Sequence, residues 1–190
     1  MKKIALISDG WRRYVTYAWV AGIMQGARQL GVDICLYTYN TNGNLSHDDK
    51  FNEGEYALLE QIDYDDFDGF IYDCSNIENP DVITATVERL KQVKVPVVSI
   101  SYYVEGFHYV GNDNKNLIRQ VVKHMYDVHG CRKMIFAGGP QYHYENIQRF
   151  EAFCETLEEL GLPVSEESYM FGDFDFDTGV RYFSEWIEAG

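Results

Sequence analysis

The sequence predicts an α/β fold built from doubly wound parallel sheets. Short runs of β-branched and apolar residues alternate with amphipathic stretches, and the alternation starts again near residue 110. Such alternation is typical of βαβ units, whose strands lie parallel. The chain has 190 residues, 46% hydrophobic and 24% charged, which suits one domain or one and a half small ones. We expect an N-terminal lobe (1–102), a crossover hinge rich in aromatic residues (103–109) and an incomplete C-terminal lobe (110–190).

Four strands and three helices are expected in the N-terminal lobe. The first helix begins near Thr16, after a polar and aromatic loop, and stops at Gly31. The second covers roughly 53–62, and Asn79 before Pro80 predicts an N-cap with proline at the first position of the third. The expected strands are 3–8, 34–39, 69–74 and 95–101. One face of the first helix carries Val20, Ile23, Met24, Ala27 and Leu30, and the third helix has Val82, Ile83, Val87 and Leu90 inward.

The C-terminal lobe is expected to contain three short strands and three helices. Asn112 or Asp113 caps the first of these helices, and the second is closed by Gly161 and Pro163. The last helix ends at Gly190. The expected strands are 109–111, 133–137 and 169–171. The apolar positions at helical spacing are Leu117, Val121, Val122, Met125 and Val128 in the first helix, and Val180, Phe183 and Ile187 in the last.

Charge and hydropathy exclude several classes of function. The 16 basic and 30 acidic residues give a net charge of −14, and no segment is strongly basic. Nucleic-acid backbones are bound by clustered Lys and Arg, so we expect no direct nucleic-acid binding by these residues. No run of about 18 apolar residues occurs, so we expect no membrane span and a cytoplasmic protein. The four cysteines form no C-x-x-C pair and are expected to be reduced core thiols.

Motifs for catalysis, cofactors and metals are absent or incomplete. The chain has no phosphate-binding P-loop, no dinucleotide G-x-G-x-x-G after the first strand and no G-x-S-x-G elbow, so we expect no catalytic residue and no cofactor. His124 and His129 are five residues apart, off a common helix face, which argues against a paired metal site. The D-x-D-x-D run from Asp173 opens like a calcium loop, but Thr178 and Ser184 stand where glycine and glutamate are needed.

The positive signal is the set of loops that follow the expected strands. Ligands of open α/β sheets bind outside the carboxyl ends of the strands, and here those loops are rich in aromatic and hydrogen-bonding side chains. Planar rings stack on apolar sugar faces while Asp, Asn and Arg pair with hydroxyls, so we expect a small polyhydroxylated or similar ligand. The candidate ligand-binding residues in these loops are Trp11, Tyr14, Tyr17, Asp73, Tyr102, Asp113, Tyr142, Asn146 and Phe174. Arg149 is added because it is the lone cation on a helix whose other charges are mostly acidic.

Several stretches of the second half carry a family resemblance. They are Val110–Asn114, Arg132–Pro140, Arg149–Phe153, Leu160–Pro163 and Gly172–Phe174 with the helix that follows. In order and in sequence they resemble the effector-binding core of the lac repressor (LacI/GalR) family. That resemblance implies the type I periplasmic-binding-protein fold, two Rossmann-like lobes with a small effector in the cleft, and a homodimer.

The resemblance also assigns roles to individual residues. It implies that Asp113 and Arg149 hydrogen-bond the effector, often a sugar or a purine, and that Phe174 stacks on it. Tyr142 and Asn146 fall in the loop and helix start that line the same wall. The first-lobe loop from Trp11 departs from the family's usual sequence, so its positions are approximate, and Ala152 stands where the family usually has glycine.

Three readings of the whole protein follow. The chain begins at the first strand without the family's DNA-binding helix-turn-helix, and K-I-A-L-I-S-D-G-W from Lys3 resembles the sensor found ahead of a diguanylate cyclase (GGDEF) domain in some bacteria. The leading hypothesis is therefore a non-catalytic small-molecule sensor that controls such an output. A LacI-family repressor core without its headpiece is one alternative. A doubly wound sugar-processing enzyme using Asp113 and Asp175 is the other.

Overall fold

The computed structural model describes residues 1–10, 14–39, 49–75, 77, 79–174 and 176–189. The chain divides into two compact units, Met1–Gly111 (unit 1) and Asn112–Gly190 (unit 2). Both units consist of parallel strands with helices packed beside them, so the predicted α/β class is confirmed. None of the described helices is both long enough and apolar enough to cross a membrane.

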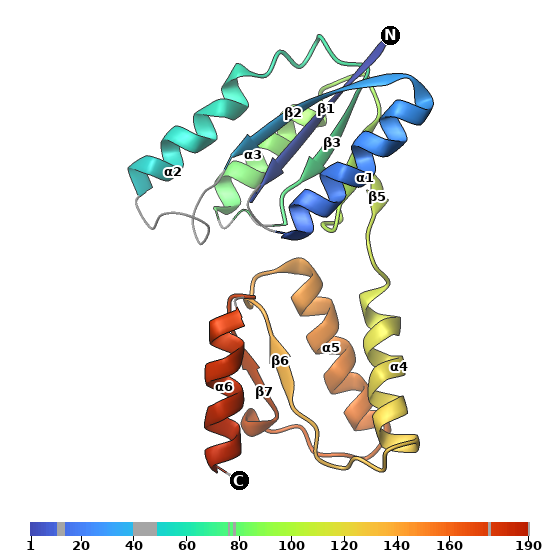
Figure 1. Ribbon diagram of the computed structural model, residues 1–190, viewed down its shortest axis with the longest axis vertical. Coiled ribbons are helices and arrows are strands. Elements are labelled where there is room, and N and C mark those ends of the chain that lie inside the picture. Colours follow the sequence, from blue (N-terminus) through green and yellow to red (C-terminus); the bar gives the residue numbers. More distant parts are fainter. Residues whose placement is uncertain (11–13, 40–48, 76, 78, 175, 190) are drawn as a thin grey trace. The chain divides into compact units, whose positions relative to one another are not determined.

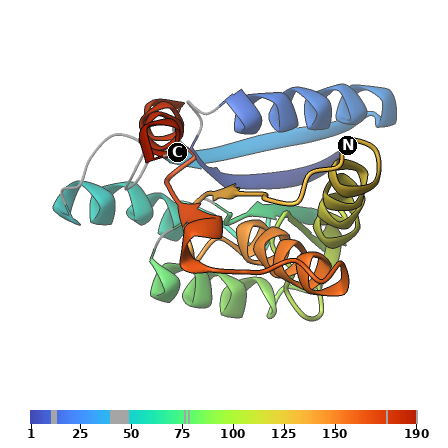
Figure 2. The same cartoon turned by 90° about the horizontal axis from the view of Figure 1, so that it is seen from below.

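Unit 1 is a five-stranded parallel sheet in the order β2-β1-β3-β4-β5. Helices α1 and α3 cover opposite faces of this sheet (Figures 1 and 2). The strands are β1 (Lys2–Asp9), β2 (Val32–Tyr39), β3 (Gly69–Asp73), β4 (Val97–Ile100) and β5 (His108–Val110). The helices are α1 (Tyr14–Leu30), α2 (Asp49–Tyr56) and α3 (Pro80–Leu90), with a 3-10 turn η1 (Ala57–Gln61).

Unit 2 has a two-stranded parallel sheet with α5 on one side and α6 on the other (Figures 1 and 2). Helices α4 and α5 pack against each other, and Val122, Phe153 and Leu157 form their buried core. The strands are β6 (Phe136–Gly138) and β7 (Tyr169–Phe171). The helices are α4 (Asn114–Asp127), α5 (Tyr144–Glu159) and α6 (Phe176–Ala189), with a 3-10 turn η2 (Glu166–Ser168).

The predicted helix caps are confirmed. The side chain of Asn79 accepts a hydrogen bond from the backbone N–H of Asp81 at 2.9 Å, and Pro80 occupies the first turn of α3. The side chain of Asp113 accepts from the backbone N–H of Asn116 at 3.2 Å at the start of α4. Both carboxamide and carboxylate oxygens satisfy N–H groups that a helix leaves unpaired in its first turn.

One predicted strand belongs to a different sheet. The sequence predicts that the strand at 109–111 is the first strand of the C-terminal lobe. The strand found there, β5, instead pairs with β4 in the sheet of unit 1. Its partners are Val98, Ser99 and Ile100. The local pattern indicates an extended run and contains no information on which neighbour will hydrogen-bond to it, so the position of this strand follows from tertiary pairing alone. The boundary between the two units accordingly lies after Gly111.

Several of the apolar positions at helical spacing are exposed. On the apolar face of α1, Leu30 is exposed, whereas Val20 and Ala27 are buried. Helical periodicity identifies residues that share a face, but coverage of that face depends on other elements. The remaining exposed positions are Leu117, Val121 and Met125 on α4, Val128 directly after it, and Val180, Phe183 and Ile187 on α6.

The four cysteines are free thiols, but only Cys74 is fully buried. Cys35, Cys131 and Cys154 are half-buried, which corrects the prediction that the cysteines lie in the core. Burial is the main cause that raises the pKa of the Cys74 thiol far above its ordinary value, and the neighbouring Asp73 carboxylate adds to the shift. Cys74 is therefore held as a neutral thiol at physiological pH.

Candidate functional site

Asp73 lies at the carboxyl end of β3, in the interior of unit 1. The structure pairs it in register with Ser8 of β1. One carboxylate oxygen accepts a hydrogen bond from Ser8 Oγ at 3.0 Å, and the other accepts from Ser75 Oγ at 2.6 Å and from Ser75 N–H at 3.0 Å. With only 1% of Asp73 exposed, the carboxylate binds two strand ends and the following turn together.

The aromatic candidates of unit 1 have different environments. Tyr14 and Tyr17 begin α1 and are exposed, at 85% and 59% of their surface. Tyr102 is half-buried and packs against the core of unit 1. Trp11 lies outside the described residues, as do its neighbours Arg12 and Arg13. Of these candidates the structure therefore presents Tyr14 and Tyr17 most openly to a ligand.

Arg149 is the centre of a polar network in unit 2. Its Nη2 lies 3.0 Å from Oε2 of Glu145, four residues earlier on α5, and its Nε donates to Oδ1 of Asn114 at 2.8 Å. Asn114 in turn donates to Glu145 Oε1 at 3.4 Å and to Gln148 Oε1 at 3.2 Å. Glu145 and Asn114 are buried, whereas 31% of the Arg149 side chain is exposed. The network joins the first turns of α4 and α5.

Asn146 organises the loop that follows β6. Its Oδ1 accepts from the backbone N–H of Gly139 at 2.8 Å, and its Nδ2 donates to the carbonyl of Pro140 at 3.2 Å. A Cβ on Gly138 would lie 2.7 Å from the same Oδ1, so this approach requires glycine. Only 2% of Asn146 is exposed. Its amide thus positions the loop in which the predicted ligand-contacting Tyr142 lies.

Phe174 and Tyr142 present aromatic surface at the same edge of unit 2. Phe174 has a left-handed backbone, with φ of 64°, and its ring lies against Gly139 where a Cβ would clash. The ring of His143 meets it edge-on, with centroids 4.9 Å apart. Phe174 is 48% exposed and Tyr142 is 54% exposed. Both rings therefore retain faces on which a ligand can stack.

The carboxyl ends of β6 and β7 lie beside these residues. Gly172 donates its N–H to the carbonyl of Gly138 at 2.9 Å, which joins the two strand ends directly. Helices α4, α5 and α6 all begin at this end of unit 2 (Figure 1). The network of Arg149, the loop held by Asn146 and the ring of Phe174 thus share the edge at which α/β sheets bind their ligands.

Sequence reasoning missed Glu145 and Asn114 as site residues. It treated Arg149 as a lone cation, but Glu145 pairs with it across one helical turn. The i, i+4 spacing of Glu145 and Arg149 was a readable signal for this pair. Asn114 gave no such signal, because its partners lie more than 30 residues away along the chain.

The histidine pair and the acidic run are the two other groups of potential metal ligands that the sequence contains. Nε2 of His124 lies 3.2 Å from Nε2 of His129, so the spacing argument against their approach was wrong: α4 ends at Asp127 and the chain turns back. Among the described residues, however, no three His, Cys, Asp or Glu side chains gather to hold a metal ion. Asp173 accepts from Thr178 Oγ1 at 3.1 Å, and Asp175 lies outside the described residues.

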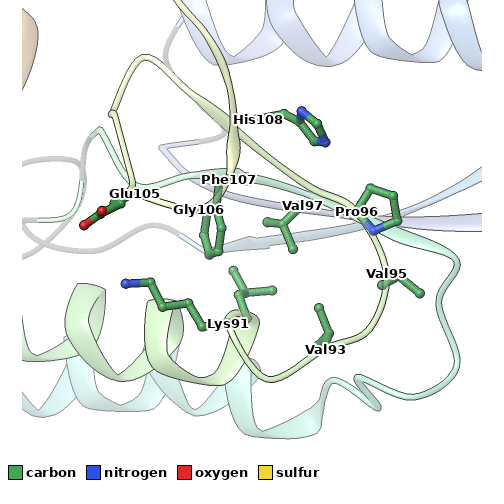
Figure 3. Close-up of a pocket in the computed structure, with 10 residues that line it drawn as sticks. Lys91, Val93, Val95, Pro96, Val97, Glu105, Gly106, Phe107 and His108 are labelled. Atoms are coloured by element: carbon green, nitrogen blue, oxygen red, sulfur yellow. The ribbon is translucent and has the colours of Figure 1, made fainter.

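A pocket of about 390 Å³ lies elsewhere in unit 1 (Figure 3). Val97 and His108 place it at the amino ends of β4 and β5, beside the end of α3 at Leu90. Figure 3 shows the ring of Phe107 between Val97 and Lys91 in this pocket. Its lining includes none of the predicted site residues that the structure describes, and it lies at the sheet edge opposite to that expected for a ligand.

No family model matches the sequence, but individual proteins do. Catabolite control protein A of Priestia megaterium is 23% identical over 173 residues, which cover 89% of this chain and 50% of that protein. The chain thus spans half the length of this curated relative.

Solved structures agree on the fold. The transcription regulator CcpA of Lactococcus lactis superposes with a TM-score of 0.76 at 19% identity, over 100% of this chain and 65% of that one. A periplasmic binding protein/LacI transcriptional regulator from Alkaliphilus metalliredigens, complexed with D-xylulofuranose, gives a TM-score of 0.64 at 21% identity. This match covers 93% of this chain and 58% of that one. The lac repressor dimer bound to operator and an anti-inducer gives a TM-score of 0.74 at 15% identity, over 99% of this chain and 61% of that one. The chain therefore has the fold of LacI-type, periplasmic-binding-protein-like domains.

Proposed function

We propose that this chain is the effector-binding core of a bacterial LacI-type regulatory protein, and that its effector is a small sugar-like or purine-like molecule. The observation that carries the proposal is that the polar network of Arg149 and the half-exposed ring of Phe174 both belong to the carboxyl edge of the unit 2 sheet. A guanidinium that hydrogen-bonds in plane and a ring that stacks are the groups that recognise a compact polar ring.

In this proposal the unit 2 residues have distinct roles. Arg149 and Asp113 hydrogen-bond the effector, while Phe174 and Tyr142 stack on it. Asn146 holds the loop that carries Tyr142 rather than contacting the effector, because only 2% of Asn146 is exposed and its amide is hydrogen-bonded to that loop. In unit 1, taken by itself, the candidate ligand-binding residues are Trp11, Tyr14, Tyr17 and Tyr102, while Asp73 supports the strand ends.

The comparisons favour a transcriptional regulator as the whole protein. Two of the solved structures described above are named as transcriptional regulators, and one of these two is complexed with D-xylulofuranose. None of the matched proteins described above is a diguanylate cyclase, so the cyclase output rests only on the resemblance of the first strand and its loop. An effector that prefers one arrangement of the two lobes would shift the population toward it and so change the output. By analogy with the lac repressor dimer we propose a homodimer.

Isothermal titration calorimetry of the full-length natural protein tests this proposal. The panel consists of neutral monosaccharides, their phosphate esters and purine bases and nucleosides. We expect saturable binding of at least one class, and we expect Arg149→Gln to abolish it while Arg119→Gln, on α4, leaves it unchanged. A folded protein that binds none of these compounds would refute the proposed function. Formation of cyclic diguanylate from GTP by the full-length protein would support the cyclase output over the regulator.

A further inference from the structure

We propose that Glu145 makes unit 2 selective for an uncharged, hydroxyl-bearing part of the effector and against a phosphate or carboxylate. This inference rests on the proposed function, since it concerns the ligand of the same site. It follows from three features of unit 2: the neutralised charge of Arg149, the way Glu145 is held in place, and the carboxylates at the helix starts.

The charge of Arg149 is already balanced within the protein. Its Nη2 lies 3.0 Å from Glu145 Oε2, and only 10% of the Glu145 side chain is exposed, against 31% for Arg149. Because the pair is shielded from water on the Glu145 side, the attraction between the two charges is stronger than it would be at the surface. An anionic ligand would have to approach the guanidinium while a buried carboxylate stays within contact distance of it.

Glu145 is also held so that it cannot easily move aside. Its Oε1 accepts hydrogen bonds from the side-chain amides of Asn112 at 3.5 Å and Asn114 at 3.4 Å. Asn114 is itself 2% exposed and accepts from Arg149 Nε at 2.8 Å. Moving the carboxylate away would leave a buried amide donor short of an acceptor, which is unfavourable. The carboxylate is therefore part of the site in the presence of ligand as well.

Helices α4, α5 and α6 begin at this edge (Figure 1), and each of the three helix starts has a carboxylate of the chain. A helix start with free N–H groups normally attracts anions. Here Asp113 accepts from the N–H of Asn116 at the start of α4, Glu145 lies in the first turn of α5, and Asp177 lies in the first turn of α6. Each helix start is thus supplied with negative charge from the protein, and an incoming phosphate would meet carboxylates.

What remains available suits neutral hydroxyl groups. Arg149 retains exposed N–H donors, and the carboxylate of exposed Asp113 can accept hydrogen bonds. A hydroxyl both donates and accepts, so adjacent hydroxyls can bridge these two groups without adding charge. The half-exposed ring of Phe174 offers a face to the apolar side of the same ligand.

The test compares each neutral monosaccharide with its own phosphate ester by isothermal titration calorimetry of the full-length natural protein. For a sugar that binds, we expect its phosphate to bind at least about tenfold more weakly. In Glu145→Gln we expect this discrimination to shrink by about tenfold, because the guanidinium is then free to pair with the phosphate. Glu151→Gln is the matched control: it removes the same charge from α5, but Glu151 is exposed and pairs with Lys115 at 2.8 Å.

Each outcome distinguishes the inference from the proposed function. A wild-type protein that prefers the phosphate ester overturns the inference while supporting the proposed function, and this comparison does not depend on any variant folding. If Glu145→Gln and Glu151→Gln reduce the discrimination between sugar and phosphate ester equally, the selectivity comes from overall charge. This outcome also overturns the role of Glu145. A wild-type protein that binds no sugar, no phosphate ester and no purine refutes the proposed function itself.

Discussion

The two units are built from the same alternation of strands and helices, but they bury their apolar side chains to different extents. In unit 1, five parallel strands lie between helices, and the buried cluster includes Ile7, Phe70, Tyr72 and Leu90. In unit 2, two strands support a buried cluster of Val122, Phe153 and Leu157. The comparison shows that burial depends on how many elements cover each helix, because a helix face is buried only where a strand or another helix lies against it.

The candidate charged residues of the two units also differ in burial, with the more buried one in unit 1. In unit 1, Asp73 is fully buried and both its oxygens serve the strand ends. In unit 2, Arg149 is partly exposed and its network lies at the helix starts. Asp73 thus holds the strand ends together from the interior of unit 1, whereas the guanidinium of Arg149 in unit 2 remains partly open to solvent.

The largest expected effect is in the core of unit 1. Phe70 is 1% exposed and its ring lies 5.5 Å from those of Tyr64 and Phe67. We expect Phe70→Ala to lower the free energy of unfolding of unit 1 by about 3–5 kcal/mol, because it leaves a cavity that the sheet cannot close. Phe153→Ala is the matched change in unit 2. It should lower the free energy of unfolding by a smaller amount, because the small core of unit 2 can collapse around the missing ring. Hydrogen exchange of the amides in β3 and α5 measures the two units separately. Equal losses would contradict the comparison.

The next effect concerns the loop after β6. We expect Asn146→Ala to lower the free energy of unfolding of unit 2 by about 1–3 kcal/mol, because a buried hydrogen bond to the Gly139 N–H and a partly buried one to the Pro140 carbonyl are lost. Faster hydrogen exchange at Gly139 should accompany the loss. Gln141→Ala, an exposed change in the same loop, is the control and should leave both measurements unchanged. Normal exchange at Gly139 in Asn146→Ala would show that the loop does not depend on this amide.

Alkaline pH should destabilise unit 1 more than unit 2. Burial raises the pKa of Cys74, Tyr39 and Tyr72 in the folded chain. Their stabilising contribution is complete below the unfolded pKa, about 8.5 for a thiol, and declines above it because only the unfolded chain releases the proton. Above that pH, the thiol alone should lower the free energy of unfolding of unit 1 by about 1.4 kcal/mol per pH unit.

Urea unfolding between pH 7 and 10, with hydrogen exchange in each unit, measures this decline. Cys74→Ala is the control, because removal of the thiol should flatten the pH dependence of unit 1. The pKa of Cys154 in unit 2 is also raised, mainly by burial, but this thiol is only half-buried and should contribute less. A stability of unit 1 that does not change over this range would contradict the burial of these groups.

The smallest expected effect lies on the exposed face of α6. Phe183 is 64% exposed, so Phe183→Ser removes little buried area. We expect the free energy of unfolding to change by no more than about 0.5 kcal/mol. Thermal and urea unfolding measure it beside Phe153→Ala, the buried counterpart. A loss as large as that of Phe153→Ala would show that the face of α6 is covered in the protein.

The sequence by itself determined the order and type of the elements and the caps that begin two of the helices. Asn79 and Asp113 cap α3 and α4 as predicted, because capping depends on residues within one turn. The fold class followed from the same local periodicity. The loops at the strand ends were also identified in this way, and with them the edge of unit 2 at which Arg149 and Phe174 lie.

Only the tertiary structure decided which partners those local elements found. It assigned β5 to the first sheet, brought His129 back to His124, and placed Asn114 between Glu145 and Arg149. It also left the apolar faces of α4 and α6 exposed. Periodicity describes a residue's neighbours along one element, whereas sheet pairing, coverage and ion-pair networks depend on residues far away in the chain. For that reason the place of Asn114 in the candidate site could be read only from the folded molecule, whereas the spacing of Glu145 and Arg149 already indicated their pairing.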